Sequence, residues 1–69
     1  MNKIKSLIIH APRCTLTYNV GEIDNWVDEE VKTINIFVDK NKVPVYAEIL
    51  YKKSKQKTTF YGFPMMIVE

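Results

Sequence analysis

Apolar and polar residues alternate along residues 13–20, which is the clearest structural signal in the chain. The apolar positions are Cys14, Leu16, Tyr18 and Val20, and the polar positions between them are Arg13, Thr15, Thr17 and Asn19. This period of two predicts a half-buried β-strand whose threonines face solvent. Residues 4–10 are rich in apolar and β-branched side chains, and Pro12 separates the two segments. We therefore expect a β-hairpin that turns at residues 10–13.

A second hairpin is predicted over residues 33–52, with a polar turn at residues 39–42. In its first strand, Ile34, Ile36 and Val38 alternate with Thr33, Asn35 and Phe37. In its second strand, Val45, Ala47, Ile49 and Tyr51 alternate with Tyr46, Glu48, Leu50 and Lys52. Pro44 has no amide proton to donate to a ladder, so we expect it at the start of a strand or on an unpaired edge. Residues 58–63 predict a fifth strand, a bend follows at residues 62–64, and residues 65–69 form a sixth short segment.

The segment between the two hairpins is rich in acidic residues and has a different period. Its apolar residues Ile23, Trp26, Val27 and Val31 fall at i, i+3, i+4 and i+8, which places them on one face of a helix. Asp24 can cap the start of such a helix. Two turns of helix, or a tight irregular loop anchored by Trp26, are both consistent with this pattern. In either case Trp26 would cover one end of the sheet, with the carboxylates facing solvent. Trp26 is an interface anchor if it is exposed and a core plug if it is not, and Ile23 and Val27 on the same face favour the plug.

These elements amount to five or six short strands and at most one short helix around residues 24–31. A flat sheet of this size would leave one face open to water, so we expect a closed or half-closed structure. The predicted fold is mainly β: a small antiparallel barrel or curled sheet of the SH3-like or OB-like kind, formed by residues 1–69 as a single domain. A chain of 69 residues buries only about 60% of the surface that it exposes when unfolded. Self-association would therefore add to its stability.

The composition of the chain predicts where the protein is located more clearly than it predicts what the protein does. A single cysteine excludes an internal disulfide, and no apolar run is long enough for a signal peptide core or a membrane span. We therefore expect a cytoplasmic protein that does not enter membranes. The net charge is +2, but residues 1–38 sum to −1 and residues 39–69 sum to +3. This uneven distribution suggests oppositely charged surfaces.

The residues needed for catalysis or for cofactor binding do not form a recognisable pattern. The two glycines cannot form a phosphate-binding loop. His10 and Cys14 could supply at most two ligands to a metal ion. The simpler interpretation is that Cys14 fills the inner face of its strand and His10 caps the hairpin. We therefore predict no catalytic residue, no metal site and no cofactor, and a protein that is not an enzyme.

Binding remains, and one candidate ligand is single-stranded DNA or RNA. The lysine turn at residues 52–57 would contact phosphates, and the aromatic residues after it would stack on bases. Phe60 and Tyr61 point to opposite faces of a strand, so Phe60 is assigned to the core, and Tyr61 and Phe63 are expected to be the exposed pair. The candidate nucleic-acid-binding residues are Lys52, Lys53, Lys55, Lys57, Tyr61 and Phe63. The simpler interpretation of the lysines, which we favour, is a hairpin tip that stays soluble and resists edge-to-edge pairing.

The leading hypothesis is a protein-interaction module that regulates, inhibits or assists a larger protein. Many small proteins encoded by phages and mobile elements act in this way, which is a general analogy only. Methionines at the end of the chain are adaptable contact residues, and the acidic segment would suit a basic partner. The candidate protein-binding residues are Trp26, Asp28, Glu29, Glu30, Met65 and Met66. We also expect a homo-oligomer formed through an edge strand, with residues 65–69 either closing the barrel or pairing with another copy.

Overall fold

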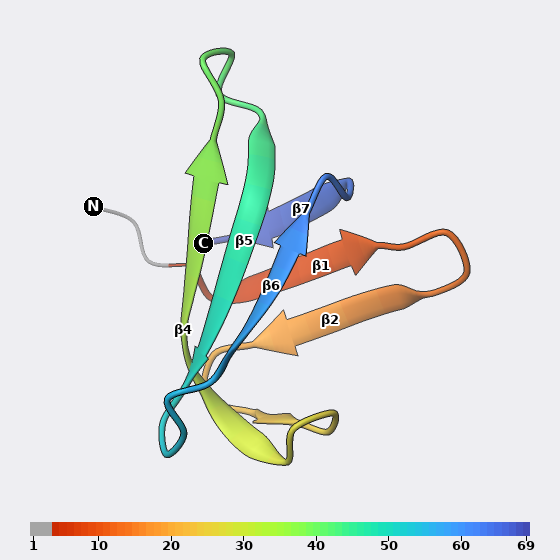
Figure 1. Ribbon diagram of the computed structural model, residues 1–69. Coiled ribbons are helices and arrows are strands. Elements are labelled where there is room, and N and C mark those ends of the chain that lie inside the picture. Colours follow the sequence, from red (N-terminus) through yellow and green to blue (C-terminus); the bar gives the residue numbers. More distant parts are fainter. Residues whose placement is uncertain (1–3) are drawn as a thin grey trace.

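The computed structural model describes residues 4–69, and all of the regular structure in this range is β-strand (Figure 1). The strands are β1 (Ser6–His10), β2 (Thr15–Asn19), β3 (Ile23–Asp24), β4 (Glu29–Val38), β5 (Pro44–Tyr51), β6 (Lys57–Tyr61) and β7 (Met65–Val68). The mainly β fold class is confirmed. The short helix considered around residues 24–31 does not form, because β3, a loop and the start of β4 occupy that segment. Residues 4–69 also contain no helix that is long and apolar enough to cross a membrane.

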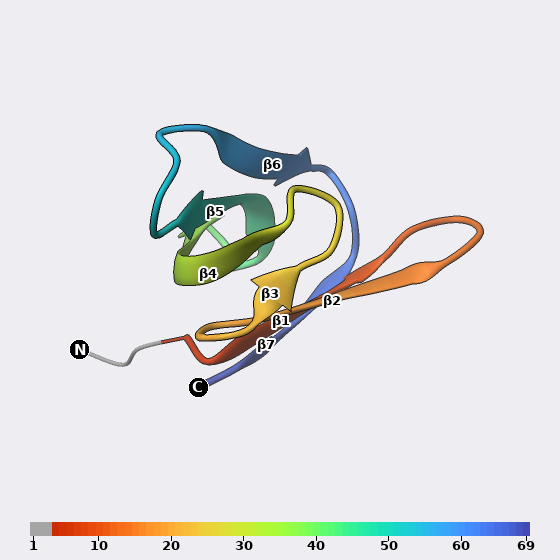
Figure 2. The same ribbon diagram turned by 90° about the horizontal axis from the view of Figure 1, so that it is seen from below.

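The strands form two antiparallel sheets that lie in two layers (Figure 2). One sheet has the order β2-β1-β7, and the other has the order β3-β4-β5-β6. The predicted hairpins β1–β2 and β4–β5 are both present. β7 pairs with β1 of the same chain, with Met66 opposite Ile8. The C-terminal segment therefore completes the three-stranded sheet.

The chain crosses between the two sheets at two glycine corners. Gly21 has φ 90° and follows β2, and Gly62 has φ 81° and follows β6. Such positive φ angles cost little for glycine but are strained for residues that carry a Cβ. Beside the second corner, the His10 amide donates a 2.9 Å hydrogen bond to the Pro64 carbonyl. These corners fold the four-stranded sheet back over the three-stranded sheet, which gives the curled half-barrel form.

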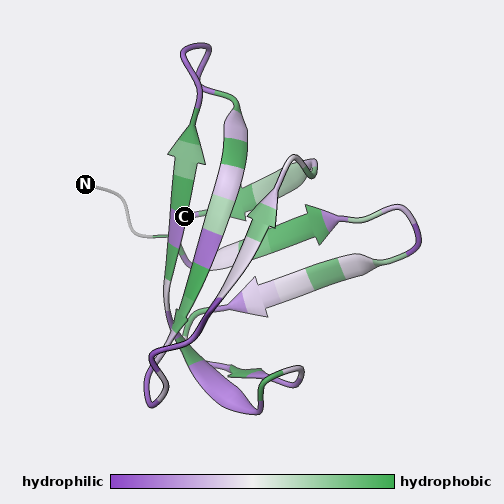
Figure 3. Ribbon diagram, viewed as in Figure 1, coloured by the Kyte–Doolittle hydropathy of each residue, from purple (hydrophilic) through white to green (hydrophobic). Residues whose placement is uncertain are grey.

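The core lies between the two layers and is formed mainly by side chains on the inner faces of β1, β2, β4 and β5. Its buried hydrophobic residues are Leu7, Ile9, Tyr18, Val31, Ile34, Ala47, Ile49 and Tyr51. The alternation predicted for β5 is confirmed, because Ala47, Ile49 and Tyr51 are buried and Val45 is half-buried. In β2 it holds for Tyr18, Leu16 and the exposed threonines, whereas Val20, beyond the end of the strand, is exposed. Pro44 is the first residue of β5, as expected. Figure 3 shows that the hairpin tips at residues 39–42 and 52–56 are hydrophilic.

Two residues of the first hairpin lie outside the core. Cys14 is exposed, so the expectation that it fills the inner face of a strand is wrong. The reason is that β2 begins only at Thr15, and Cys14 belongs to the hairpin loop, where the Ala11 amide donates to its carbonyl. His10 ends β1 and is also exposed.

β4 is paired unevenly along its length. β3 covers only its first residues, with Ile23 opposite Glu30 and Asp24 opposite Glu29. β5 pairs with β4 as far as Val38. Within residues 4–69, no strand pairs with the outer side of β4 between residues 33 and 38. We call this segment the open edge of β4.

Candidate functional site

Trp26 is the most exposed large hydrophobic residue described, with 80% of its surface accessible. The expectation that it plugs the core is therefore wrong. Residues 25–28 form the loop of the β3–β4 hairpin instead of a helix, so a spacing of three and four residues does not bring the apolar side chains to one face. Of the apolar residues in that segment, Val27 and Val31 belong to the core or pack against it, whereas Ile23 is 55% exposed.

Asp24 holds this hairpin loop in one conformation. One of its carboxylate oxygens accepts a 3.0 Å hydrogen bond from the Trp26 amide. Its main-chain carbonyl accepts hydrogen bonds of 3.2 Å and 2.7 Å from the Val27 and Asp28 amides. These contacts satisfy the backbone donors of Trp26 and of the two residues that follow it. Trp26 is therefore exposed on an ordered turn.

The second carboxylate oxygen of Asp24 connects the hairpin to the core. It accepts a hydrogen bond of 2.5 Å from the Tyr51 hydroxyl, which also contacts the Thr58 hydroxyl. Asp24 is only 6% exposed and Tyr51 only 4%, so this network joins β3 to β5 and β6 in a buried setting. A buried polar group that lost its partner here would keep its desolvation cost.

The same environment raises the pKa of two phenols. Burial raises the pKa of Tyr18 from 10.0 to about 12, and the nearby Asp24 charge adds to the effect. Burial likewise raises the pKa of Tyr51 to about 12, helped by the hydrogen bond that its hydroxyl donates to Asp24. Both hydroxyls therefore hold their protons more tightly in the folded protein than in the unfolded chain.

We expect the free energy of unfolding to fall as pH rises from about 10 to about 12. Below the pKa of tyrosine in the unfolded chain, 10.0, the stability that comes from burying these two protonated hydroxyls is fully present. It is lost as the pH rises through the pKa that Tyr18 and Tyr51 have in the folded protein, about 12. Tyrosinate absorbance and circular dichroism, recorded together against pH, measure this effect. The double variant Tyr18→Phe/Tyr51→Phe should lose this pH dependence. An unchanged alkaline profile in that variant would show that other groups cause the unfolding.

Of the acidic candidate residues, one is exposed to solvent and the other two are paired or partly buried. Asp28 is exposed and has φ 58°, a left-handed conformation that aspartate tolerates better than most residues. Glu30 forms a 2.6 Å ion pair with Lys52. One oxygen of Glu29 is buried and has no hydrogen-bond partner among the described residues. The exposed acidic residues beside the hairpin are therefore Asp28 and Glu22. Glu22 was not among the candidate residues predicted from the sequence.

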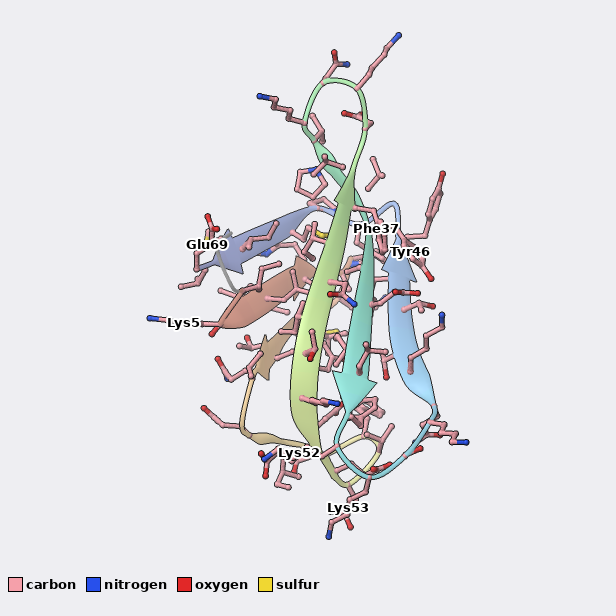
Figure 4. The ribbon with its side chains drawn as sticks, turned by 90° about the vertical axis from the view of Figure 1, so that its left-hand side faces the viewer. Lys5, Phe37, Tyr46, Lys52, Lys53 and Glu69 are labelled. Atoms are coloured by element: carbon pink, nitrogen blue, oxygen red, sulfur yellow. The ribbon has the colours of Figure 1, made fainter. Side chains whose placement is uncertain are left out.

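The candidate nucleic-acid residues do not come together on one surface. Lys52, Lys53 and Lys55 lie in or beside the β5–β6 turn, at the opposite end of the sheet from Phe37 and Tyr46 (Figure 4). Tyr61 pairs with Tyr46 in the ladder, so it lies at the same end as the aromatic residues. Tyr61 is 75% exposed, as expected.

Two other members of that set have partners within the protein. Phe63 packs against the core and against Phe60, with ring centroids 6.1 Å apart, so its expected exposure is wrong. Lys57 donates a 2.8 Å hydrogen bond to Glu48. That bond lowers the pKa of Glu48 and raises the pKa of Lys57. The ion pair neutralises the outer face of β5 and β6 near its centre.

A row of three aromatic rings crosses the outer face of the four-stranded sheet. Phe37 lies 5.4 Å from Tyr46, and Tyr46 lies 6.3 Å from Tyr61, measured between ring centroids. Neighbouring cross-strand aromatic residues of this kind stabilise a sheet by roughly 0.2–1 kcal/mol per pair. The sequence places Tyr46 and Tyr61 in two different strands but does not show that they lie side by side. Their contact depends on the register of three strands.

The methionine candidates lie on opposite faces of β7. Met65 packs against the core, whereas Met66 is 54% exposed. Only Met66 is therefore available to a partner, and it lies on a different sheet from the Trp26 hairpin.

The fold and the hairpin together define a small all-β protein with one ordered, exposed tryptophan turn. Comparison with protein families, with curated proteins and with solved structures finds no match to this chain.

Proposed function

We propose that this protein is a protein-interaction module that binds a larger partner through its β3–β4 hairpin. The observation that carries the proposal is Trp26, which is 80% exposed on a turn fixed by Asp24. Tryptophan is enriched among residues that dominate binding energy, and an ordered turn loses little entropy when it binds. The module would act as a small regulatory or accessory subunit.

The surface around Trp26 defines the chemistry of the partner. Ile23 is 55% exposed in the same hairpin and extends the apolar contact. Glu22 and Asp28 are exposed on either side of the turn. A complementary partner would therefore offer an apolar pocket bordered by lysine or arginine side chains.

Nucleic acid is the alternative, and the arrangement of charge favours protein. Single-strand binding needs a basic groove that runs along the stacking residues. Here Lys52 and Lys53 lie at the opposite end of the sheet from the aromatic row (Figure 4). Lys40 and Lys42 lie nearer to the row, but they are in the β4–β5 turn beyond the ends of the strands. An oligonucleotide titration at low and high salt distinguishes the two ligands, since phosphate contacts weaken steeply as salt rises.

The proposal is tested by selecting random displayed peptides on the folded chain and measuring their binding in solution. Trp26 is the only tryptophan, so a peptide that covers it should shift its fluorescence emission to shorter wavelength. The selected peptides should combine basic and apolar residues. Trp26→Ala should weaken their binding at least tenfold, which is the loss expected on removing a central contact worth more than about 1.4 kcal/mol.

The matched control is Tyr61→Ala, which removes another exposed aromatic ring from a different surface. It should leave peptide binding unchanged, and Glu22→Lys should weaken the binding of basic peptides. If the selected peptides bind the Trp26→Ala variant as tightly as the unaltered chain, the hairpin is not the binding site. Salt-sensitive binding of poly-dT that Tyr61→Ala weakens would favour nucleic acid instead.

A further inference from the structure

The open edge of β4 differs from the other outer edges of the two sheets. Its sequence from residue 33 to residue 38, TINIFV, contains no charged residue, no proline and no glycine. Phe37 and Val38 are about half exposed, at 49% and 54%. Natural proteins usually protect an edge of this length and composition, because it readily pairs with another strand.

The remaining outer strands carry or adjoin residues that discourage pairing. Arg13 precedes β2, Lys57 lies in β6, and Pro64 and Glu69 flank the short strand β7. Lysine, proline and brevity are the usual means of protecting a sheet edge. The open edge of β4 contains none of them between residues 33 and 38, and its charged neighbours, Lys32 and Asp39, lie only at its two ends.

The hydrogen-bond alternation shows which backbone groups of β4 point outward. The Gly62 amide donates to the Val45 carbonyl, so the backbone of Val45 faces β6. In an antiparallel ladder the direction alternates, which turns the backbone of Glu48 toward its partner Asn35. The amides and carbonyls of Ile34 and Ile36, on either side of Asn35, must therefore point away from β5.

We propose that the open edge of β4 pairs with the same edge of a second copy, antiparallel about a two-fold axis at Asn35. Ile34 of each copy then lies opposite Ile36 of the other, and their outward amides and carbonyls complete the hydrogen bonds in both directions. The edge is thus complementary to itself, as a two-fold interface requires. The two four-stranded sheets join into one continuous sheet. This inference is independent of the Trp26 hairpin.

The side chains and charges beside the edge favour a second copy as the occupant. A groove of about 900 Å³ runs along the edge, and its apolar lining includes Ile4, Val20, Ile34 and Ile36. Ile36 of the second copy is half-buried and lies on the inward face of the pleat, so its side chain faces this groove, whereas Ile34 stays in the core of its own copy. The groove is lined by Lys5 and Lys32 as well as by the exposed Glu22. The loop at residues 39–43 of the second copy carries both Asp39 and two lysines, and it comes to lie near Glu22 and Lys32, so that each charge meets an opposite one.

The test combines solution mass with disulfide trapping. Light scattering of the unaltered chain should give twice the mass of one chain. In a Cys14→Ser background, Asn35→Cys places two thiols opposite each other on the axis. Directly opposed residues have Cα atoms about 4.5 Å apart at such a position, which is within the range of a disulfide. Mild oxidation should link this variant into a covalent dimer.

Thr33→Cys in the same background is the matched control, because it alters the same outer face of β4. In the proposed register Thr33 lies opposite Phe37 of the second copy, so the two Thr33 positions are about 13 Å apart along the strands. This variant should form at least tenfold less covalent dimer. Trp26→Ala should leave the mass unchanged. A monomeric mass, or a dimer in which Asn35→Cys cross-links no better than Thr33→Cys, would overturn the proposal.

Discussion

Replacing Ile49 with alanine should lower the free energy of unfolding by about 3 kcal/mol, the middle of the range for removing a buried isoleucine. Ile49 has no exposed surface and lies in β5 between β4 and β6. The cavity left by its side chain cannot close easily, because strands on both sides hold the backbone in place. For a domain of this size such a loss corresponds to a fall in melting temperature of about 12–24 °C. Urea unfolding followed by far-ultraviolet circular dichroism measures it.

Ile23→Ala is the matched control for this prediction, because it makes the same chemical change at a 55% exposed position. It should alter the free energy of unfolding by no more than about 0.5 kcal/mol. Equal effects of the two substitutions would mean that the core does not lie between the two sheets as described.

Replacing Asp24 with alanine should cost about 3 kcal/mol, because the buried Tyr51 hydroxyl and the Trp26 amide both lose an acceptor. Circular dichroism is the appropriate probe, since Trp26 is too exposed to report on the core. The variant should also bind selected peptides more weakly under conditions where it remains folded, because the turn that presents Trp26 is no longer fixed.

Asp24→Asn tests whether these hydrogen bonds are the cause. The amide oxygen of asparagine can still accept from the Trp26 amide, so this variant should retain a substantial part of the stability. Tyr51→Phe should remove the hydrogen bonds that the Tyr51 hydroxyl makes with Asp24 and Thr58 and keep the one from the Trp26 amide. If Asp24→Ala costs as much in the Tyr51→Phe background as in the original chain, the two residues are not coupled.

The strands were largely predictable because local patterns determine them. Alternation located β2, β4 and β5, Pro44 was expected at the start of a strand or on an unpaired edge and begins β5, and the bend expected at residues 62–64 contains the corner at Gly62. Tyr61 was correctly expected to be exposed. These successes share one cause: the side-chain period of two does not depend on what the opposite sheet contributes.

The candidate site was only partly predictable, because exposure depends on neighbours that are distant in sequence. The spacing around Trp26 suggested a helix face, yet Asp24 makes its hydrogen bonds within a hairpin and with Tyr51. Phe63 was expected on the surface, but the bend at Gly62 turns its ring toward Phe60. The open edge of β4 likewise follows from β3 being so short, and the composition of residues 33–38 was its only sequence signal.

Because β4 is ten residues long, it contributes to both the Trp26 hairpin and the open edge, so the proposed dimer would carry two binding sites. The first residues of β4 belong to the Trp26 hairpin, and its last residues form the open edge. In an antiparallel pair about Asn35, the two hairpins begin about 40 Å apart, at about 3.3 Å per residue. Each dimer would then present two binding turns at opposite ends of one continuous sheet. A partner that repeats its binding pocket at that spacing would be held by avidity, with an apparent affinity above that of either turn alone.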